Sequence, residues 1–377
     1  MIRGKDLAGG KGVAVQVKNG RIAKVAAGAG SRWIAPGLVD LQINGFRGMD
    51  FNTLPVAAEL PGKVTRELWA EGVTSYLATV ITNAPPAIDE SCRAIARGCE
   101  EDEAAREGIA GIHLEGPFIS PEDGPRGAHA KAFVRAPDWD LFRRWQDAAG
   151  GRIRLITLSP EWPESTSFIA KAADSDVLVS IGHTAATPDQ VRAAVDAGAR
   201  VSTHLGNGAH LVMPRNPNYL WEQLADDRLS ACFIADGFHL PDAVMKVLLR
   251  AKGRRAMLVS DAVYLAGLPP GTYDTHIGGK VVLTEEGKLH LAANPNLLAG
   301  SAAMVLRGVE RLVAAGLCSL KEAWELASVR PAGLLGLPAA KGLKPGAPAD
   351  LVVFEEDEGR LRVVETWKNG SKVYSRR

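Results

Sequence analysis

The chain has 377 residues, of which 46% are hydrophobic and 23% charged, enough to fill one large α/β barrel or two domains of average size. Its 44 Lys and Arg against 43 Asp and Glu give a net charge of +1, which offers no general field for nucleic acid or an acidic membrane, and we expect neither partner. The four cysteines show no Cys-x-x-Cys pairing and the N-terminus lacks the apolar core of a signal peptide, so we expect a cytoplasmic protein.

Both ends of the chain predict short β-strands. Residues 13–17 and 21–25 flank the dipeptide Asn19-Gly20, and a second dipeptide, Asn369-Gly370, precedes residues 372–374; Asn-Gly is the strongest short hairpin signal. Neither end has enough residues for a core of its own. We therefore predict a small β-sandwich domain built from both termini, residues 1–36 and 340–377.

Residues 37–339 have a different pattern, in which short apolar runs alternate with amphipathic helical stretches. One helix is marked by Thr187 and Gln190 as a capping box, by Pro188 in the first turn and by Gly198 at the end. Strands separated by helices imply a parallel sheet, and eight of them favour a (β/α)8 barrel over the competing open doubly wound sheet. The eight runs are 38–43, 73–78, 109–114, 153–158, 177–181, 200–203, 231–235 and 256–259.

Acidic and imidazole side chains follow several of these runs. Glu115 ends the third run, His183 follows the fifth and His204 the sixth. The carboxyl ends of barrel strands share one face, so these three groups could converge on one ion. Two imidazoles and a carboxylate suit zinc and leave a fourth position for water, as a catalytic site requires. We predict one divalent metal ion per subunit, with zinc as the first choice.

Asp261 follows the eighth run and is the predicted general base, which takes a proton from water and returns it to a leaving amine. A single histidine at a strand end is more often a hydrogen-bonded structural group than a ligand. Agreement of four such residues at the ends of four runs favours a metal site. His113, two positions before Glu115, is interpreted as a packed core residue.

With these residues placed, the chain resembles the amidohydrolase superfamily, in particular its branch of N-acetylglucosamine-6-phosphate deacetylases. Glu-Gly-Pro-Phe at 115–118 is specific to that branch, whereas Pro-Gly-x-x-Ala-Asp-Leu at 345–351 marks the superfamily alone. The matching segments run nearly from end to end: 35–45, 72–75, 113–118, 127–129, 182–184, 203–207, 236–239, 260–262, 298–301 and 345–351.

The resemblance implies roles for individual residues. It makes Glu115, His183 and His204 the metal ligands and Asp261 the catalytic base and acid, and it places His129 near the acyl carbonyl or a hydroxyl of the substrate. Asn207 with Gly208, and His239, match two of the groups that hold the sugar phosphate in this family, and Arg215 stands for the third. The resemblance also implies a small amino sugar substrate, deacetylation to the amine and acetate, and a homodimer.

Two segments depart from wider family patterns. Many members carry His-x-His at the end of the first strand and bind a second metal, but this chain has Gln42 and Asn44 there, which argues for one ion. The loop at 209–221, which contains Arg215, is atypical, so an unphosphorylated N-acyl sugar or another amide stays open as the substrate. A catalytically dead scaffold barrel is the alternative from another class, and the complete set of four site residues argues against it.

Overall fold

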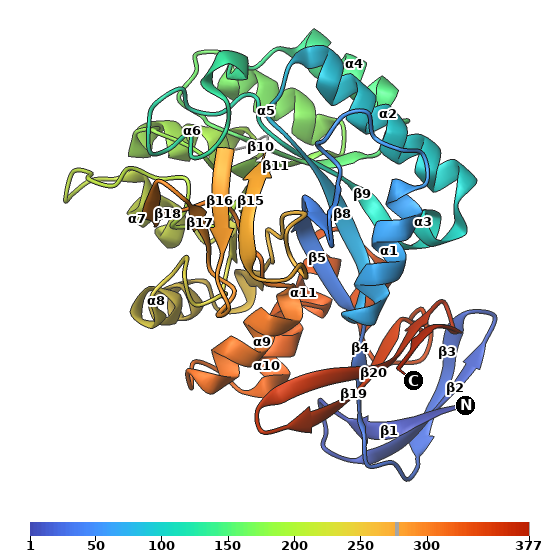
Figure 1. Ribbon diagram of the computed structural model, residues 1–377. Coiled ribbons are helices and arrows are strands. Elements are labelled where there is room, and N and C mark those ends of the chain that lie inside the picture. Colours follow the sequence, from blue (N-terminus) through green and yellow to red (C-terminus); the bar gives the residue numbers. More distant parts are fainter. Residues whose placement is uncertain (276–278, 377) are drawn as a thin grey trace.

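The computed structural model describes residues 1–275 and 279–376, and at its centre eight parallel strands are ringed by helices (Figure 1). The strands pair in chain order, and the first and last of them meet through a parallel bridge between Ile43 and Ala262 that nearly closes the barrel. The predicted (β/α)8 barrel is confirmed. Its strands are β5 (Leu38–Ile43), β8 (Val73–Ile81), β9 (Ile109–Glu115), β10 (Ile153–Leu158), β11 (Leu178–Ile181), β12 (Val201–Ser202), β13 (Ser230–Phe233) and β14 (Ala256–Leu258).

The barrel strands are apolar runs because both of their faces are covered. One set of side chains, including Leu41, Leu77 and Leu155, packs in a cluster of its own, and a second set, including Ile112 and Ile156, belongs to the large cluster shared with the helices. Strand β5 is buried along its whole length. Polar side chains at the strand ends are therefore held on a rigid base.

The helices follow the strands around the barrel. Helix α6 begins and ends as predicted, because Thr187 and Gln190 form a capping box and Gly198 ends the helix with a φ of 126°. The helices are α1 (Leu60–Ala70), α2 (Pro85–Glu101), α3 (Glu103–Gly108), α4 (Trp139–Ala148), α5 (Ser165–Asp174), α6 (Pro188–Ala197), α7 (Tyr219–Ala225), α8 (Asp242–Lys252), α9 (Val305–Ala314), α10 (Leu320–Leu326) and α11 (Val329–Leu334). Short 3-10 turns lie at Lys131–Phe133, Gly253–Arg255 and Pro338–Lys341. None of the helices in the described part of the chain is long and apolar enough to cross a membrane.

The two chain ends form one seven-stranded sheet beside the barrel (Figure 1). Both Asn-Gly dipeptides sit in hairpin turns with positive φ, as predicted. The expected sandwich is one continuous sheet in its pairing, because β4 joins β1 on one side and β19 on the other. In sheet order the strands are β21 (Ser371–Ser375), β20 (Arg360–Lys368), β19 (Leu351–Asp357), β4 (Trp33–Pro36), β1 (Ile2–Asp6), β2 (Gly12–Lys18) and β3 (Arg21–Ala27).

Buried polar contacts join the terminal sheet to the barrel. The ammonium of Lys368 in β20 donates to Asp350 at 2.8 Å and to Ser75 of β8 at 3.0 Å. Trp324 of α10 stacks on Phe354 of β19, with ring centroids 4.5 Å apart. The division into residues 1–36 with 340–377 and residues 37–339 stays a prediction, and its last residue, Arg377, lies outside the described residues.

Two smaller β elements lie outside the barrel. A two-stranded ribbon, β6 (Gly45–Phe46) and β7 (Met49–Asp50), follows β5. A four-stranded antiparallel sheet of β15 (Gly271–Thr275), β16 (Gly279–Leu283), β17 (Leu289–Leu291) and β18 (Asn294–Leu298) lies between β14 and α9. We did not predict this sheet, because its strands are short and largely solvent-facing. Alternation at 280–283 and 288–291 around a Gly287 turn was the available signal.

Candidate active site

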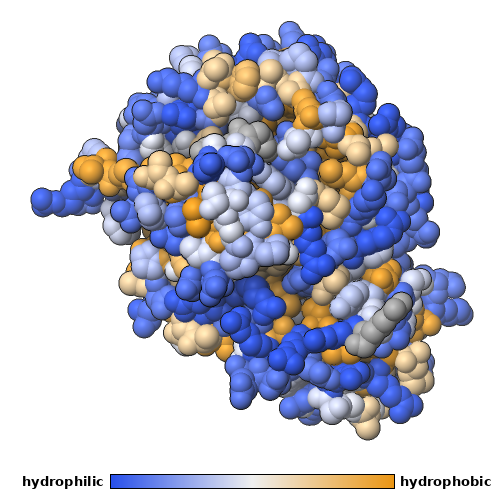
Figure 2. Space-filling view, in the orientation of Figure 1, coloured by the Kyte–Doolittle hydropathy of each residue, from blue (hydrophilic) through white to orange (hydrophobic). Residues whose placement is uncertain are grey.

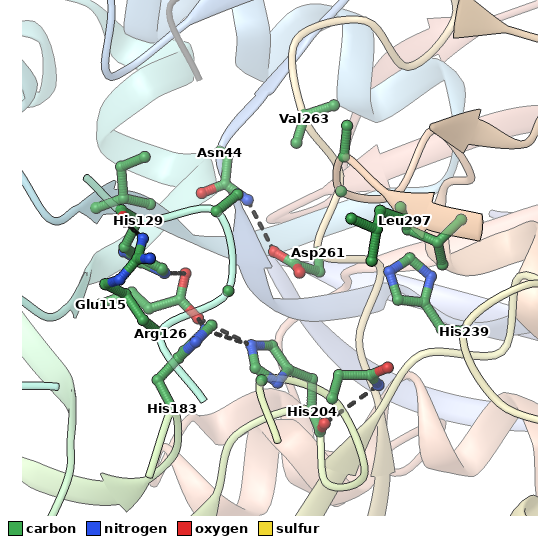
Figure 3. A pocket seen from close by; sticks show the side chains of 18 of the residues that line it. Asn44, Glu115, Arg126, His129, His183, His204, His239, Asp261, Val263 and Leu297 are labelled. Atoms are coloured by element: carbon green, nitrogen blue, oxygen red, sulfur yellow. Dashed lines mark hydrogen bonds and ion pairs between the residues drawn. The ribbon is translucent and has the colours of Figure 1, made fainter. Parts of the chain in front are cut away.

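A cavity of about 700 Å³ opens at the carboxyl ends of the barrel strands. Figure 3 shows its centre, where imidazole and carboxylate groups from different strands face one another. One side is lined by strand ends and the other by the segments 206–211 and 297–300. Of the predicted site residues, all but one line this cavity: Glu115, His129, His183, His204, Asn207, Gly208, His239 and Asp261.

Glu115, His183 and His204 form a buried cluster whose ligand atoms all lie within 4.8 Å of one another. The Nε2 atoms of the two histidines are 3.1 Å apart, and Oε1 of Glu115 lies 3.0 Å from His204 Nε2 and 3.4 Å from His183 Nε2. Ligands at zinc bond lengths of 2.0–2.1 Å are separated by about 3.3 Å in a tetrahedron. The three atoms therefore fit one face of a tetrahedral metal site.

The backbone around the cluster sets the orientation of the two imidazole rings. His183 and His204 have positive φ values of 49° and 26°, which are uncommon for residues with a side chain. Nδ1 of His183 lies 2.9 Å from the carbonyl of Pro125 and must donate there, which leaves Nε2 as the ring nitrogen that faces Glu115. Gly208 lies against this ring: a Cβ at that position would come within 2.7 Å of His183 Nδ1.

The charge balance of the cluster also favours a cation. Burial opposes ionisation of Glu115, but hydrogen bonds and charge interactions with His183 and His204 hold its pKa well below the usual range. Burial likewise disfavours a charged His204, yet contact with Glu115 raises the pKa of that ring. An ionised carboxylate and two imidazole nitrogens that face it are the donor set of a divalent metal.

Asp261, three residues after the end of β14, is partly buried and faces the same cavity. Burial, followed by the charge of Glu115, raises its pKa to about 6. Asn44 donates from Nδ2 to Asp261 Oδ1 at 2.8 Å, and Gln42 donates from Nε2 to Glu115 Oε1 at the same distance. The two amides thus act as hydrogen-bond donors to the carboxylates, which agrees with the expectation that neither is a metal ligand.

His129 lies beside the cluster and stays neutral. Its Nε2 is 4.0 Å from Glu115 Oε2, and its ring meets His183 edge-to-face at 4.4 Å. Burial lowers the pKa of His129 to about 3, and its Nδ1 has no partner among the described residues. A neutral imidazole with a free ring nitrogen can donate a hydrogen bond to a substrate oxygen.

The substrate-binding predictions divide into two groups. His239 lines the cavity and donates from Nδ1 to Asp236 at 2.7 Å, which presents its Nε2 to the interior. Asn207 and Gly208 also line it, whereas Arg215 is exposed and is not among its lining residues.

Arg126, which the sequence did not single out, lines the cavity and donates to the carbonyl of His129 at 2.7 Å. The available signal was its place between Gly124 and Gly127, just before the predicted His129.

Sequence reasoning also missed the apolar wall of the cavity. Val263, Leu291, Leu297 and Leu298 come from the four-stranded sheet and its flanks. Figure 3 shows Val263 and Leu297 on the same side of the cavity as Asp261 and His239, away from Glu115. This wall could not be placed without knowing that residues 279–298 fold back over the barrel end.

An eight-stranded barrel with an acid and imidazole cluster at its carboxyl end is the architecture of a metal-dependent hydrolase. A model of the amidohydrolase family matches residues 33–373, and the chain belongs to that family.

Within the family, its relatives are deacetylases of N-acetylated amino sugar phosphates. It is 35% identical to N-acetylglucosamine-6-phosphate deacetylase of Bos taurus, over 94% of this chain and 86% of the relative. It is 31% identical to N-acetylgalactosamine-6-phosphate deacetylase of Escherichia coli O157:H7, over 89% of this chain and 86% of the relative. The structure of a mutant N-acetyl-D-glucosamine-6-phosphate deacetylase from Mycobacterium smegmatis, in complex with N-acetyl-D-glucosamine-6-phosphate, matches with a TM-score of 0.86, at 31% identity and over 97% and 95% of the two chains.

Proposed function

We propose that this enzyme hydrolyses the acetamide of N-acetylglucosamine 6-phosphate, or of a close N-acetylamino sugar phosphate, to the amino sugar phosphate and acetate. The observation that carries the proposal is the convergence of Glu115, His183 and His204 with Asp261 in one cavity, in a chain of this family. The other residues of the cavity supply hydrogen-bond donors and acceptors suited to a sugar.

Glu115, His183 and His204 would hold one divalent ion, and we propose zinc because two imidazoles and a carboxylate match its preferences. When bound, the ion supplies Lewis-acid activation of water and of the amide carbonyl. Gln42 and Asn44 occupy the positions where many members have histidines, and both donate hydrogen bonds to carboxylates, which supports a single ion.

The remaining chemistry belongs to the side chains of the chain. Asp261 takes the proton from the attacking water and later returns it to the amine as the carbon–nitrogen bond breaks. A raised pKa suits a carboxylate that must accept a proton and release it within one turnover. His129, neutral and facing the cluster, is placed to donate to the carbonyl oxygen as negative charge develops on it.

We propose that Asn207 and Gly208, together with His239, hold the phosphate. Arg215 is exposed and does not line the cavity, and we propose that it reaches the phosphate in a neighbouring copy of the chain. The same loop exposes Leu211 by 87% and Val212 by 88%, and Figure 2 shows apolar surface on the segment that projects to the left. These exposed residues support a homodimer.

A cytoplasmic location is supported by the four free cysteines.

Substrate identity is tested by comparing rates of acetate release from the 6-phosphates of N-acetylglucosamine and N-acetylgalactosamine with those from the unphosphorylated sugars. We expect turnover of at least one phosphate, with a far lower kcat/KM for the free sugar. Metal-loaded protein that releases no acetate from either phosphate would contradict the proposal. Equal rates on free and phosphorylated sugar would favour the alternative, an unphosphorylated N-acyl sugar, which the position of Arg215 outside the cavity motivates.

A further inference from the structure

Strand β5 carries an irregularity at the point where it reaches the active site. Its pairing with β8 shifts register between Asp40 and Ile43. Leu41 packs in the cluster of barrel residues, and the next residue, Gln42, already contacts Glu115. A regular strand sends neighbouring side chains to opposite faces, so a bulge is needed to place this pair.

Side chains satisfy the backbone groups that the bulge removes from the strand ladder. The N–H of Gln42 donates to Asp40 Oδ1 at 3.2 Å, and the N–H of Ile43 donates to Thr79 Oγ1 at 3.1 Å. The carbonyl of Leu41 accepts from His113 Nδ1 at 3.1 Å. Each of these contacts is buried. The bulge is therefore stabilised by specific buried side-chain contacts.

The same bulge is tied to the residues on either side of Asp261. The carboxylate of Asp40 accepts the N–H of Ser260 at 3.2 Å and 3.3 Å. Ser260 Oγ donates to the carbonyl of Gln42 at 3.3 Å and accepts the N–H of Ala262 at 3.1 Å. The N–H of Asn44 donates to the carbonyl of Ala262 at 2.8 Å.

Asp261 itself has a φ of 50°, a left-handed conformation that its neighbours must hold in place. Its side chain is fixed from the same strand, because Asn44 donates to its Oδ1. Both the backbone and the carboxylate of Asp261 are thus constrained by β5. Asp40 is fully buried and touches neither the cavity nor the metal cluster among the described contacts.

We infer that the β5 bulge fixes the position of the catalytic carboxylate of Asp261. Asp40 and Asn44 are positioning residues that act through Asp261. The inference rests on the proposed function, since it assumes that Asp261 is the base. It also assigns His113 a role in holding the bulge, beyond that of a packed core residue. Misplacing a reacting group by an ångström can lower the rate by about 100-fold without changing binding.

The inference is tested with the variants Asn44→Ala and Asp40→Asn in the full-length, metal-loaded enzyme. We expect kcat to fall by about 100-fold for Asn44→Ala and about 10-fold for Asp40→Asn, with KM within about twofold and one metal per chain. The matched control is Thr366→Val, which removes a buried hydrogen bond to the carbonyl of Trp69 in the terminal sheet and should leave kcat unchanged.

A double variant separates positioning from a general structural effect. If Asn44 acts through Asp261, then Asn44→Ala lowers the residual rate of Asp261→Asn by less than about twofold, because effects within one functional unit are not additive. A further full loss on that background would overturn the inference. So would a kcat of Asn44→Ala within about twofold of the original enzyme, or a loss of activity that tracks loss of metal.

The outcomes for the positioning role and for the proposed function can be told apart. If Asp40→Asn fails to fold, the Asn44→Ala variant alone tests the positioning role, because Asn44 lies at the cavity surface. If the unaltered enzyme releases no acetate from the sugar phosphates, the proposed function fails first. An active enzyme whose Asn44→Ala variant is equally active removes the positioning role and leaves the proposed function intact.

Discussion

The two sides of the cavity are built differently. On one side the strand ends carry Glu115, His183 and His204, each less than a tenth exposed and each held by contacts to other strands or loops. On the other side the segments 206–211 and 297–300 carry apolar side chains with large exposed fractions, 87% for Leu211 and 40% for Leu297. The proposed metal ligands are held rigidly by the barrel, whereas the groups that would surround the substrate come from loops.

This contrast explains why the reaction could be inferred more firmly than the substrate. Strand-end residues are constrained by pairing on both sides, so their types and spacing reflect the chemistry of the site. Loop residues have few such constraints and can change with the substrate. Four measurements would break or sharpen this comparison.

The largest effect should come from the strand-end base. The variant Asp261→Asn removes the proton acceptor and keeps the shape, so we expect kcat to fall by about 1000-fold while the metal content is unchanged. The measurement is acetate release under saturating substrate, with metal analysis of the same sample. Near-normal turnover would show that another group moves the proton.

The next largest effect should appear in metal binding. The variant Glu115→Gln replaces an ionised ligand with a neutral amide, and we expect metal affinity to fall by at least about 100-fold. Chelator competition gives the affinity, and activity should return when excess metal is added. If affinity is unchanged, Glu115 is not a ligand and the ion sits elsewhere.

A smaller effect is expected on the loop side. The variant Arg215→Ala should raise KM for the phosphorylated sugar by about 10-fold, since one charge-assisted hydrogen bond is lost, and should leave kcat nearly unchanged. Steady-state kinetics on phosphorylated and free sugar give the comparison. An equal change on both substrates would remove Arg215 from phosphate recognition.

The last prediction concerns the stability of the barrel and not the rate of the reaction. Burial raises the pKa of Asp40 from an ordinary 3.8 to about 7. Between these two pH values the folded state holds a proton that the unfolded state releases. The contribution of Asp40 to the free energy of unfolding is therefore complete below pH 3.8 and is lost as the pH rises through about 7.

Relative to Asp40→Asn, the free energy of unfolding should therefore decline by up to about 1.4 kcal/mol per pH unit in that window. Denaturant titrations of both proteins at several pH values, with saturating metal, measure the difference. Parallel curves would show that Asp40 titrates as it does in the unfolded chain.

The barrel, the eight strands and the hairpins of the terminal sheet could be predicted, because each follows from short-range patterns such as the capping box at Thr187 and the turn at Asn19. The convergence of Glu115, His183 and His204 followed from the geometry of strand ends. The four-stranded sheet of β15 to β18 could not be placed, since its short strands bury little. Arg126 and the contacts of Asn44 depend on how distant loops and strands meet, which periodicity does not encode.

The barrel closes at the bridge between Ile43 and Ala262, and Asp261 is the residue just before that junction. The seam that completes the ring is therefore also the place where the proposed general base meets the proposed metal ligands. The position of the proposed base therefore depends on closure of the barrel at this seam.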